Sequence, residues 1–167
     1  MFENDLTRRI AEFLIEIGLQ IAPKQLDENT FLFGIFIENG GIFVDESKLA
    51  FPGDLLHEAG HLAVMPKYLR AHLSDEIELP GEFDIDVVEV ASIAWSYAAA
   101  LHLDLNPRVV FHEGGYKGNS ESLLMNFSLG VYIGVNTLED TEMTATGENA
   151  RRLGVSPYPQ MLKWLRD

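Results

Sequence analysis

FPGDLLHEAGHLAVMP, residues 51–66, predicts one helix with its own start and stop signals. The helix should open at Pro52-Gly53-Asp54, a sequence typical of a first helical turn. It should end before Pro66, because proline supplies no amide hydrogen and restricts the residue before it. The other elements of the chain are placed relative to this helix.

His57 and His61 are four residues apart in this helix and therefore lie on one face of it. Both imidazoles can then point at one position about 2 Å away, the length of a zinc–nitrogen bond. Glu58 is rotated by about 100° around the helix and can reach a water at that position without displacing a histidine. The spacing His-Glu-x-x-His therefore predicts a metal site. The alternative is a pair of histidines with purely structural partners.

The residues around the pair predict that this helix is buried. The apolar neighbours are Leu55, Leu56, Ala59, Leu62 and Ala63. Two imidazoles and a carboxylate are costly to bury without a partner, which favours the metal site. Gly60 costs about 1 kcal/mol relative to alanine inside a helix, so we expect another segment to approach closely there.

Hydrophobic periodicity predicts the elements on either side of the motif. Apolar residues at steps of three and four predict an amphipathic helix over Asp5–Ile17. Two aromatic-rich runs around Asn39-Gly40 predict a hairpin with strands near Phe31–Ile37 and Ile42–Asp45. The segment Asp86–Leu103 is apolar on nearly every face and predicts a central, mostly buried helix.

The rest of the chain predicts shorter elements and one domain. They are a polar connection over Ser74–Phe83, a short strand in RVVFHE, a loop over Gly114–Gly118, a helix over Glu121–Phe127, a further extended piece, and two short helices broken at Pro157 and Pro159. The predicted fold is α+β: a single domain, residues 1–167, with a small antiparallel sheet packed on the motif helix and on the central helix.

Composition restricts the classes of partner and of metal ligand. The formal net charge of −14 disfavours nucleic acid and anionic membrane surfaces as partners, and we expect neither. The chain has no cysteine, so imidazole and carboxylate must supply any metal ligands. The first residues fail as a signal peptide and no run is long enough to span a bilayer, so we expect a cytoplasmic protein.

The motif resembles that of the zincin metallopeptidases. Val64 and Lys67 stand where the metzincin extension needs glycine and histidine, which excludes that branch. A hairpin ending in GIFVDES, followed closely by HEAGHLA, is similar to the gluzincin-type layout of ImmA/IrrE-like metallopeptidases. The resemblance covers roughly Phe31–Leu103, and only the five-residue motif is specific. It implies that a substrate peptide lies along a sheet edge, for which we expect the Ile42–Asp45 strand.

The resemblance also implies Glu89 as the third metal ligand, near the start of the central helix. Zinc in a hydrolytic site takes three protein ligands and keeps one open position. Glu89 can instead form a capping box with Asp86, three residues earlier. Asp86 is the second choice of ligand.

Two further residues are candidates for catalysis. His112 and Tyr116 stand in FHEGGYKG, where they can polarise a carbonyl or stabilise an oxyanion, unless the segment is an ordinary polar loop. His102 is expected to be a satisfied histidine at the end of the central helix, and His72 a solvated one.

These residues predict a zinc-dependent, peptidase-like hydrolase acting on a peptide or protein. His57, His61 and Glu89 hold Zn²⁺, and Glu58 is the general base for the attacking water. The alternative is a zincin-like metal sensor or partner-binding module without proteolytic activity. The oligomeric state is not predicted.

Overall fold

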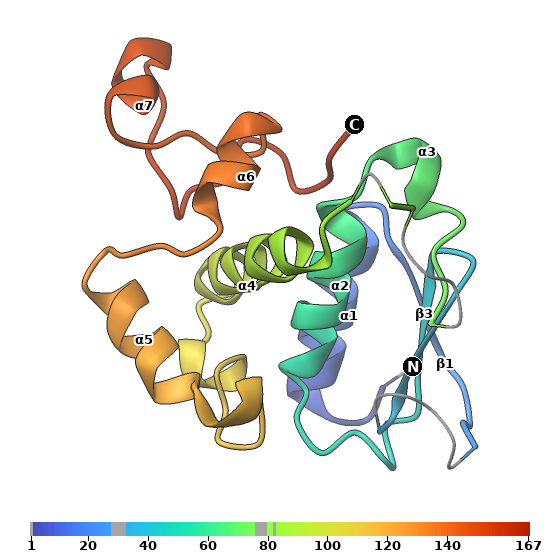
Figure 1. Cartoon of the computed structure of the whole chain (residues 1–167). Coiled ribbons are helices and arrows are strands. Elements are labelled where there is room, and N and C mark those ends of the chain that lie inside the picture. The colour runs from blue at the N-terminus through green and yellow to red at the C-terminus, as the bar shows by residue number, and fades with distance from the viewer. Residues whose placement is uncertain (1, 28–32, 76–79, 82) are drawn as a thin grey trace.

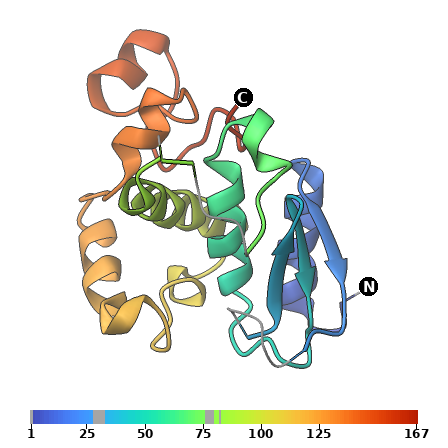
Figure 2. The same ribbon diagram turned by 45° about the vertical axis from the view of Figure 1, so that its right-hand side comes forward.

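Three short strands form a mixed sheet at one side of the molecule (Figure 2). The computed structural model describes residues 2–27, 33–75, 80–81 and 83–167. The strands are β1 (Gln20–Pro23), β2 (Ile35–Glu38) and β3 (Gly41–Val44), in the order β1-β3-β2. The predicted hairpin is confirmed as β2–β3, although residues 31 and 32 lie outside the described residues. Asn39 and Gly40 take positive φ at its turn, as the sequence predicts.

The third strand changes the expected role of the hairpin. β1 pairs with β3 in parallel, so β3 is the central strand and has a neighbour on each side. The expectation that Ile42–Asp45 offers a free edge to a substrate is therefore wrong. The outer edge of β2 is also partly covered, because the amide of Asp75 donates to the carbonyl of Ile37 and that of Gly40 donates to Leu73.

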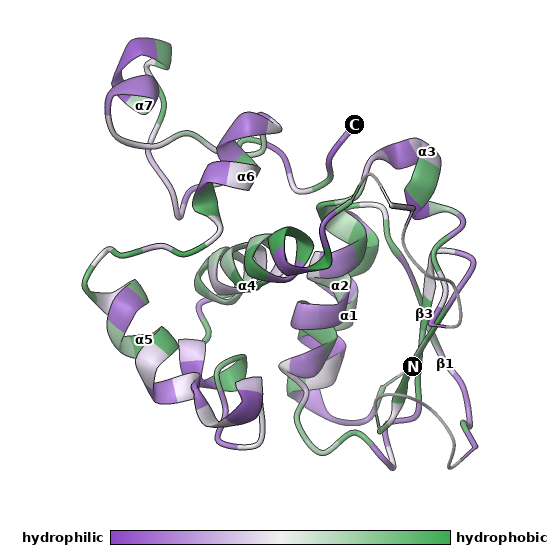
Figure 3. Cartoon of the chain, viewed as in Figure 1, coloured by the Kyte–Doolittle hydropathy of each residue, from purple (hydrophilic) through white to green (hydrophobic). Residues whose placement is uncertain are grey.

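Three helices build the core beside the sheet (Figure 1). They are α1 (Asp5–Glu16), α2 (Asp54–Ala63) and α4 (Ile85–His102), all close to their predicted bounds. α2 packs on both of the others and crosses α4. α4 is buried around most of its circumference and is apolar over much of its length (Figure 3), with Trp95 fully buried.

The crossing of α2 and α4 explains the glycine in the motif helix. A Cβ atom added to Gly60 would lie 2.9 Å from the carbonyl oxygen of Ser92 and 3.2 Å from its Cα. Any side chain at residue 60 would thus press on the backbone of α4. The predicted close approach is confirmed, and it brings the start of α4 against the histidine face of α2.

The start of α4 differs from the predicted capping box. Asp84 is the N-cap, and its side chain accepts a hydrogen bond from the amide of Asp86. The role assigned to Asp86 therefore belongs to Asp84, two residues earlier. Glu89 is not needed as a cap, and its side chain extends toward α2 instead.

The later part of the chain is more helical than predicted. The helix predicted over Glu121–Phe127 is confirmed as α5 (Ser120–Ser128). The other elements are α6 (Val135–Asp140), α7 (Gly147–Leu153) and the 3-10 turns η1 (Pro107–Val109) and η2 (Tyr116–Gly118). The strand predicted in RVVFHE is wrong, because Pro107 starts η1 there. The predicted extended piece is partly replaced by α6. Of the two tail helices only one forms, as α7.

The C-terminal segment returns to the core without forming a helix. Its amide at Arg166 donates to the carbonyl of Ala63 at the end of α2. The carbonyl of Trp164 accepts from the indole of Trp95, and the Trp164 ring packs edge-on against Phe13. The C-terminal end of α2 is thus held between the tail and α3 (Lys67–Arg70), where Arg70 donates to the carbonyl of Leu62. No helix among the described residues has the length and hydropathy needed to cross a membrane.

Candidate metal site

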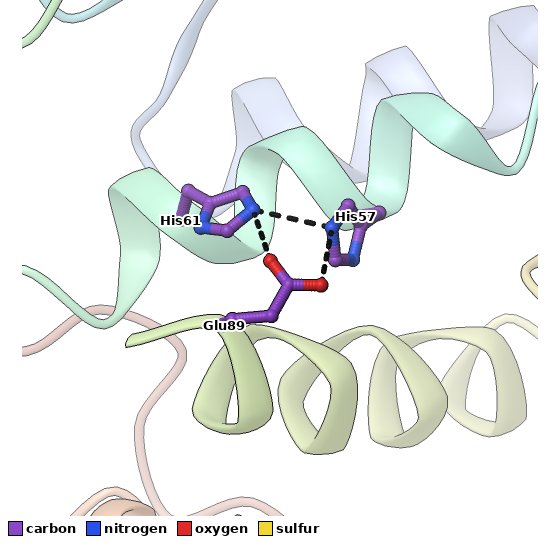
Figure 4. Close-up of side chains that lie close together, drawn as sticks. All are labelled: His57, His61 and Glu89. Carbon is purple, nitrogen blue, oxygen red and sulfur yellow. Dashed lines mark hydrogen bonds and ion pairs between the residues drawn. The ribbon is translucent and has the colours of Figure 1, made fainter. Parts of the chain in front are cut away.

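Two histidines of α2 and one glutamate of α4 meet where the helices cross (Figure 4). The Nε2 atoms of His57 and His61 lie 3.1 Å apart. The Glu89 carboxylate faces both rings, with Oε1 3.5 Å from Nε2 of His57 and Oε2 3.2 Å from Nε2 of His61. His57, His61 and Glu89 therefore lie close enough to hold one metal ion.

Ser92 determines which nitrogen of His61 carries the proton. Its hydroxyl donates to the carbonyl of Val88 at 2.8 Å, and its oxygen lies 3.1 Å from Nδ1 of His61. A hydroxyl has a single hydrogen, so here Ser92 must accept from Nδ1–H of His61. A protonated His61 ring donates from Nε2 to Glu89, whereas a neutral ring carries its hydrogen on Nδ1 and leaves the lone pair of Nε2 to a metal. This is the tautomer that a metal ligand needs.

Tyr116 stands behind the other histidine. Its hydroxyl lies 3.3 Å from Nδ1 of His57, on the ring edge opposite the one that faces Glu89. The backbone of Tyr116 and Lys117 has φ of 54° and 52°, a left-handed conformation that is uncommon outside glycine. Tyr116 therefore contacts His57 from a strained turn, in a position that suits orienting the ligand better than contacting a substrate carbonyl.

The charges of the triad stabilise one another. Hydrogen bonds from His57 and His61 hold the pKa of Glu89 well below its usual range. Burial opposes charge on His57, but Glu89 and Glu58 outweigh it and the net pKa of His57 is raised. A carboxylate is thus kept ionised between two imidazoles, which suits it to bind a cation.

Glu58 follows His57 on the same helix and shares a pocket with His61. Together with His61 it lines a pocket of about 220 Å³. Burial raises the pKa of Glu58, and the two imidazoles partly offset that effect. The pocket gives the expected general base an open space next to a candidate ligand.

His112 is not directed at the triad. Its Nε2 is 2.7 Å from Oδ1 of Asp54, and its ring stacks on Phe51 at 3.8 Å between centroids. The side chain is 10% exposed, and Nδ1 is buried with no hydrogen-bond partner among the described residues. Nε2 is thus engaged by Asp54 and Nδ1 is enclosed, and a catalytic role for His112 stays a prediction. His112 ties the loop that carries Tyr116 to the first turn of α2.

The two remaining histidines lie outside the site. His102 is the last residue of α4, and its ring packs against Phe13 and Trp164. His72 is exposed on the segment after α3. Both positions agree with the structural roles expected from the sequence.

Ser92 is a residue of the candidate site that sequence reasoning missed. Its position one turn after Glu89 places it beside the ligand on α4, but a serine in an apolar helix carries no signal of its own. The one available signal was Gly60, which marks the close contact at which Ser92 lies. Comparison with known proteins adds nothing to these assignments, since no family model, curated protein or solved structure matches the chain.

Proposed function

We propose that this protein is a zinc-dependent hydrolase that cleaves amide bonds in peptides or proteins. The observation that carries the proposal is the convergence of His57, His61 and Glu89 on one point, with the Nε2 lone pair of His61 directed there by Ser92. Two imidazoles and one carboxylate are the ligand set of many hydrolytic zinc sites, which leave a fourth position open.

The spacing of the ligand atoms fits a tetrahedral ion. Zinc–ligand distances of about 2.0–2.1 Å in a tetrahedron place the ligand atoms about 3.3–3.4 Å apart. The two Nε2 atoms are 3.1 Å apart, close to this value, and Glu89 places a separate oxygen near each of them, Oε1 3.5 Å from His57 and Oε2 3.2 Å from His61. Harder cations such as Mg²⁺ prefer oxygen ligands in octahedral array, so this donor set favours zinc.

Separate side chains of the protein bind the metal, transfer the proton and orient the ligands. A zinc ion bound here would supply Lewis acidity and lower the pKa of a coordinated water toward about 7. Glu58 takes the proton of the attacking water on its carboxylate and passes it to the leaving amine. Its raised pKa brings it closer to the pH at which a general base works best. Ser92 and Tyr116 hold the two imidazoles in place through their Nδ1 atoms.

The test separates metal binding from catalysis. Protein purified without a histidine tag and loaded with zinc should contain one metal per chain and cleave members of a broad peptide library. Glu58→Gln keeps the shape of the side chain but cannot accept the proton. We expect unchanged zinc content and a fall in the hydrolysis rate of about 10²–10⁴-fold.

Three results count against the proposal. Zinc content well below one per chain would show that these residues do not form a zinc site. Full activity in Glu58→Gln, on a confirmed substrate, refutes the mechanism. One zinc per chain with no cleavage in the library favours the non-proteolytic sensor or binding module.

A further inference from the structure

The segment 109–116 lies along the first turn of α2. The carbonyl oxygen of Val109 would lie 1.7 Å from a Cβ atom added to Gly53, so the two backbones are in direct contact there. Further along the segment, Nε2 of His112 is 2.7 Å from Oδ1 of Asp54. These two contacts fix the segment to the helix just before the helix reaches the first candidate ligand.

The ring of His112 is enclosed by Phe51 and by two glycines. It stacks on Phe51 with 3.8 Å between the centroids and 9° between the planes. A Cβ atom added to Gly114 or to Gly115 would lie 3.3 Å from the nearest atom of this ring, so the backbone passes closely over it. Nδ1 is buried without a hydrogen-bond partner among the described residues, and within that part of the chain the contact with α2 alone orients the ring by a hydrogen bond. A change at His112 would therefore act on the two glycines that lead directly to Tyr116.

Tyr116 needs such an anchor, because its backbone conformation is unfavourable by itself. Tyr116 and Lys117 have φ of 54° and 52°, in the left-handed region that costs free energy for residues other than glycine. Strained conformations of this kind persist where the surrounding structure holds them. Ser120 holds the same turn, since its hydroxyl donates to the carbonyl of His112 at 2.5 Å. The Tyr116 hydroxyl is thereby kept 3.3 Å from Nδ1 of His57.

We infer that His112 is a positioning residue of the candidate metal site, and that it acts on His57 through Tyr116. When the contact between His112 and Asp54 is removed, the turn loses its anchor on α2 and the Tyr116 hydroxyl moves away from Nδ1 of His57. Loss of the partner that orients a ligand histidine typically costs about 10–100-fold in metal affinity. The inference rests on the metal site of the proposed function and does not depend on hydrolysis.

The first test observes the ring of His57 in protein without metal. NMR of the imidazole nitrogens, at one fixed pH above the range in which histidines titrate, gives separate signals for the two nitrogens of each ring. Tyr116→Phe removes only the hydroxyl, so we expect the Nδ1 signal of His57 to shift. The signals of His61 should move much less, because the partner of its Nδ1 is Ser92. His112→Ala should produce most of the same shift at His57.

A double-mutant cycle then measures whether His112 acts through Tyr116. Competition with a chromogenic chelator should show zinc affinity about tenfold weaker in His112→Ala and in Tyr116→Phe. The double variant should also be about tenfold weaker, and not hundredfold, because both changes remove the same hydrogen bond. His112→Gln can keep a donor for Asp54 and should bind zinc within about threefold of the wild type.

Two controls separate this role from a general loss of stability. Tyr158→Phe also removes a buried hydroxyl, one that donates to the carbonyl of Ala94 on α4 at 2.8 Å. It should lower the free energy of unfolding while zinc affinity and the signals of His57 stay unchanged. His72→Ala changes an exposed histidine and should alter none of these quantities.

The outcomes separate this inference from the proposed function. Unchanged His57 signals in His112→Ala, or losses of zinc affinity that multiply in the double variant, would overturn the inference alone. If wild-type protein binds no zinc, the proposed function is wrong, and the His57 signals of the variants still decide whether His112 acts through Tyr116. If His112→Ala does not fold, His112→Leu replaces it, because leucine fills the space beside Phe51 without the hydrogen bond.

Discussion

Glu89 is the only one of the three candidate ligands that α4 supplies, so the site depends on it. The sequence left two roles for this residue, and the structure separates them. Asp84 caps α4, while the half-exposed carboxylate of Glu89 faces both imidazoles of α2. Its exposure leaves one side of the triad open to solvent, as a site that admits a substrate requires.

Glu89→Ala should lower zinc affinity by at least about 10²-fold, because it removes a charged ligand and changes even around a ligand cost about 10–100-fold. Asp86→Ala, on the same turn of the helix, should change it by less than about twofold. Competition with a chromogenic zinc chelator measures both. Equal and small losses would show that Glu89 does not bind the metal.

At the scale of elements, the site is a product of the contact between α2 and α4. Gly60 allows the two backbones to approach, and the same contact brings Ser92 to His61 and Glu89 to both histidines. A shift of α4 by a fraction of an ångström would therefore change several ligand contacts at once. The packing of the core and the geometry of the site are set by one crossing.

Gly60→Ala tests this dependence. Alanine favours a helix by about 1 kcal/mol, but its Cβ would lie 2.9 Å from the Ser92 carbonyl. Overpacking costs about 1–3 kcal/mol, so we expect net destabilisation in urea unfolding together with weaker zinc binding. Gly81→Ala, where an added Cβ meets nothing within 4 Å, should change neither. A more stable Gly60→Ala protein with intact zinc affinity would contradict the argument.

One carboxylate links α6 to the start of α7. Glu139 of α6 accepts hydrogen bonds from the amide and the hydroxyl of Thr146, both at 2.7 Å, and from the amide group of Asn149. It thereby provides the cap at the start of α7. The hydroxyl of Thr146, then Asn149 and the Thr146 amide, lower the pKa of Glu139.

Because the pKa is lowered on folding, the stabilisation is complete above the unfolded value of about 4.3 and is lost as the pH falls through the folded value. Glu139→Gln should therefore cost about 1 kcal/mol at pH 7, and the difference from wild type should shrink below about pH 4. Thermal unfolding across this range measures it. Glu148→Gln, an exposed change in α7, is the control. A difference in stability that does not vary with pH would exclude the charge of Glu139 as the cause.

For the whole molecule, the parts that could be predicted are those with strong local signals. The periodicity of α1, the apolar length of α4, the turn at Asn39-Gly40 and the motif in α2 each appear within a short window of sequence. What could not be predicted depends on contacts between distant segments. β1 is four residues long and ends in proline, and it becomes a strand only because it pairs with β3.

The same limit applies to α6 and to the site residues. The segment before α6 is rich in residues that favour strands, yet Gly134 has φ of +83° and packs against the carbonyl of Val90, and the helix starts from that contact.

Likewise His112 stands in a Gly-rich loop that suggested catalysis. Its partners, Asp54 and Phe51, lie about sixty residues away in the chain, so local sequence could not place it.

Metal binding should be coupled to the stability of the whole chain. Zinc would join α2 to α4, the two helices whose contact forms the centre of the core, and it would bind only when both are folded. A ligand at a hundred times its dissociation constant stabilises the native state by about 2.7 kcal/mol, which raises the melting temperature of a chain this size by about 5–10 °C.

Removing the metal with a chelator should reverse this rise without unfolding the protein, because Trp95 and its buried neighbours form an apolar core that does not depend on the ion. Calorimetric melting of the zinc-loaded and chelated protein measures the difference, and Glu89→Ala should show none. A rise of equal size in that variant would place the stabilising zinc elsewhere on the surface. Unfolding on chelation would instead mean that the metal is a structural requirement of the fold, and that the crossing of α2 and α4 cannot form before the ion binds.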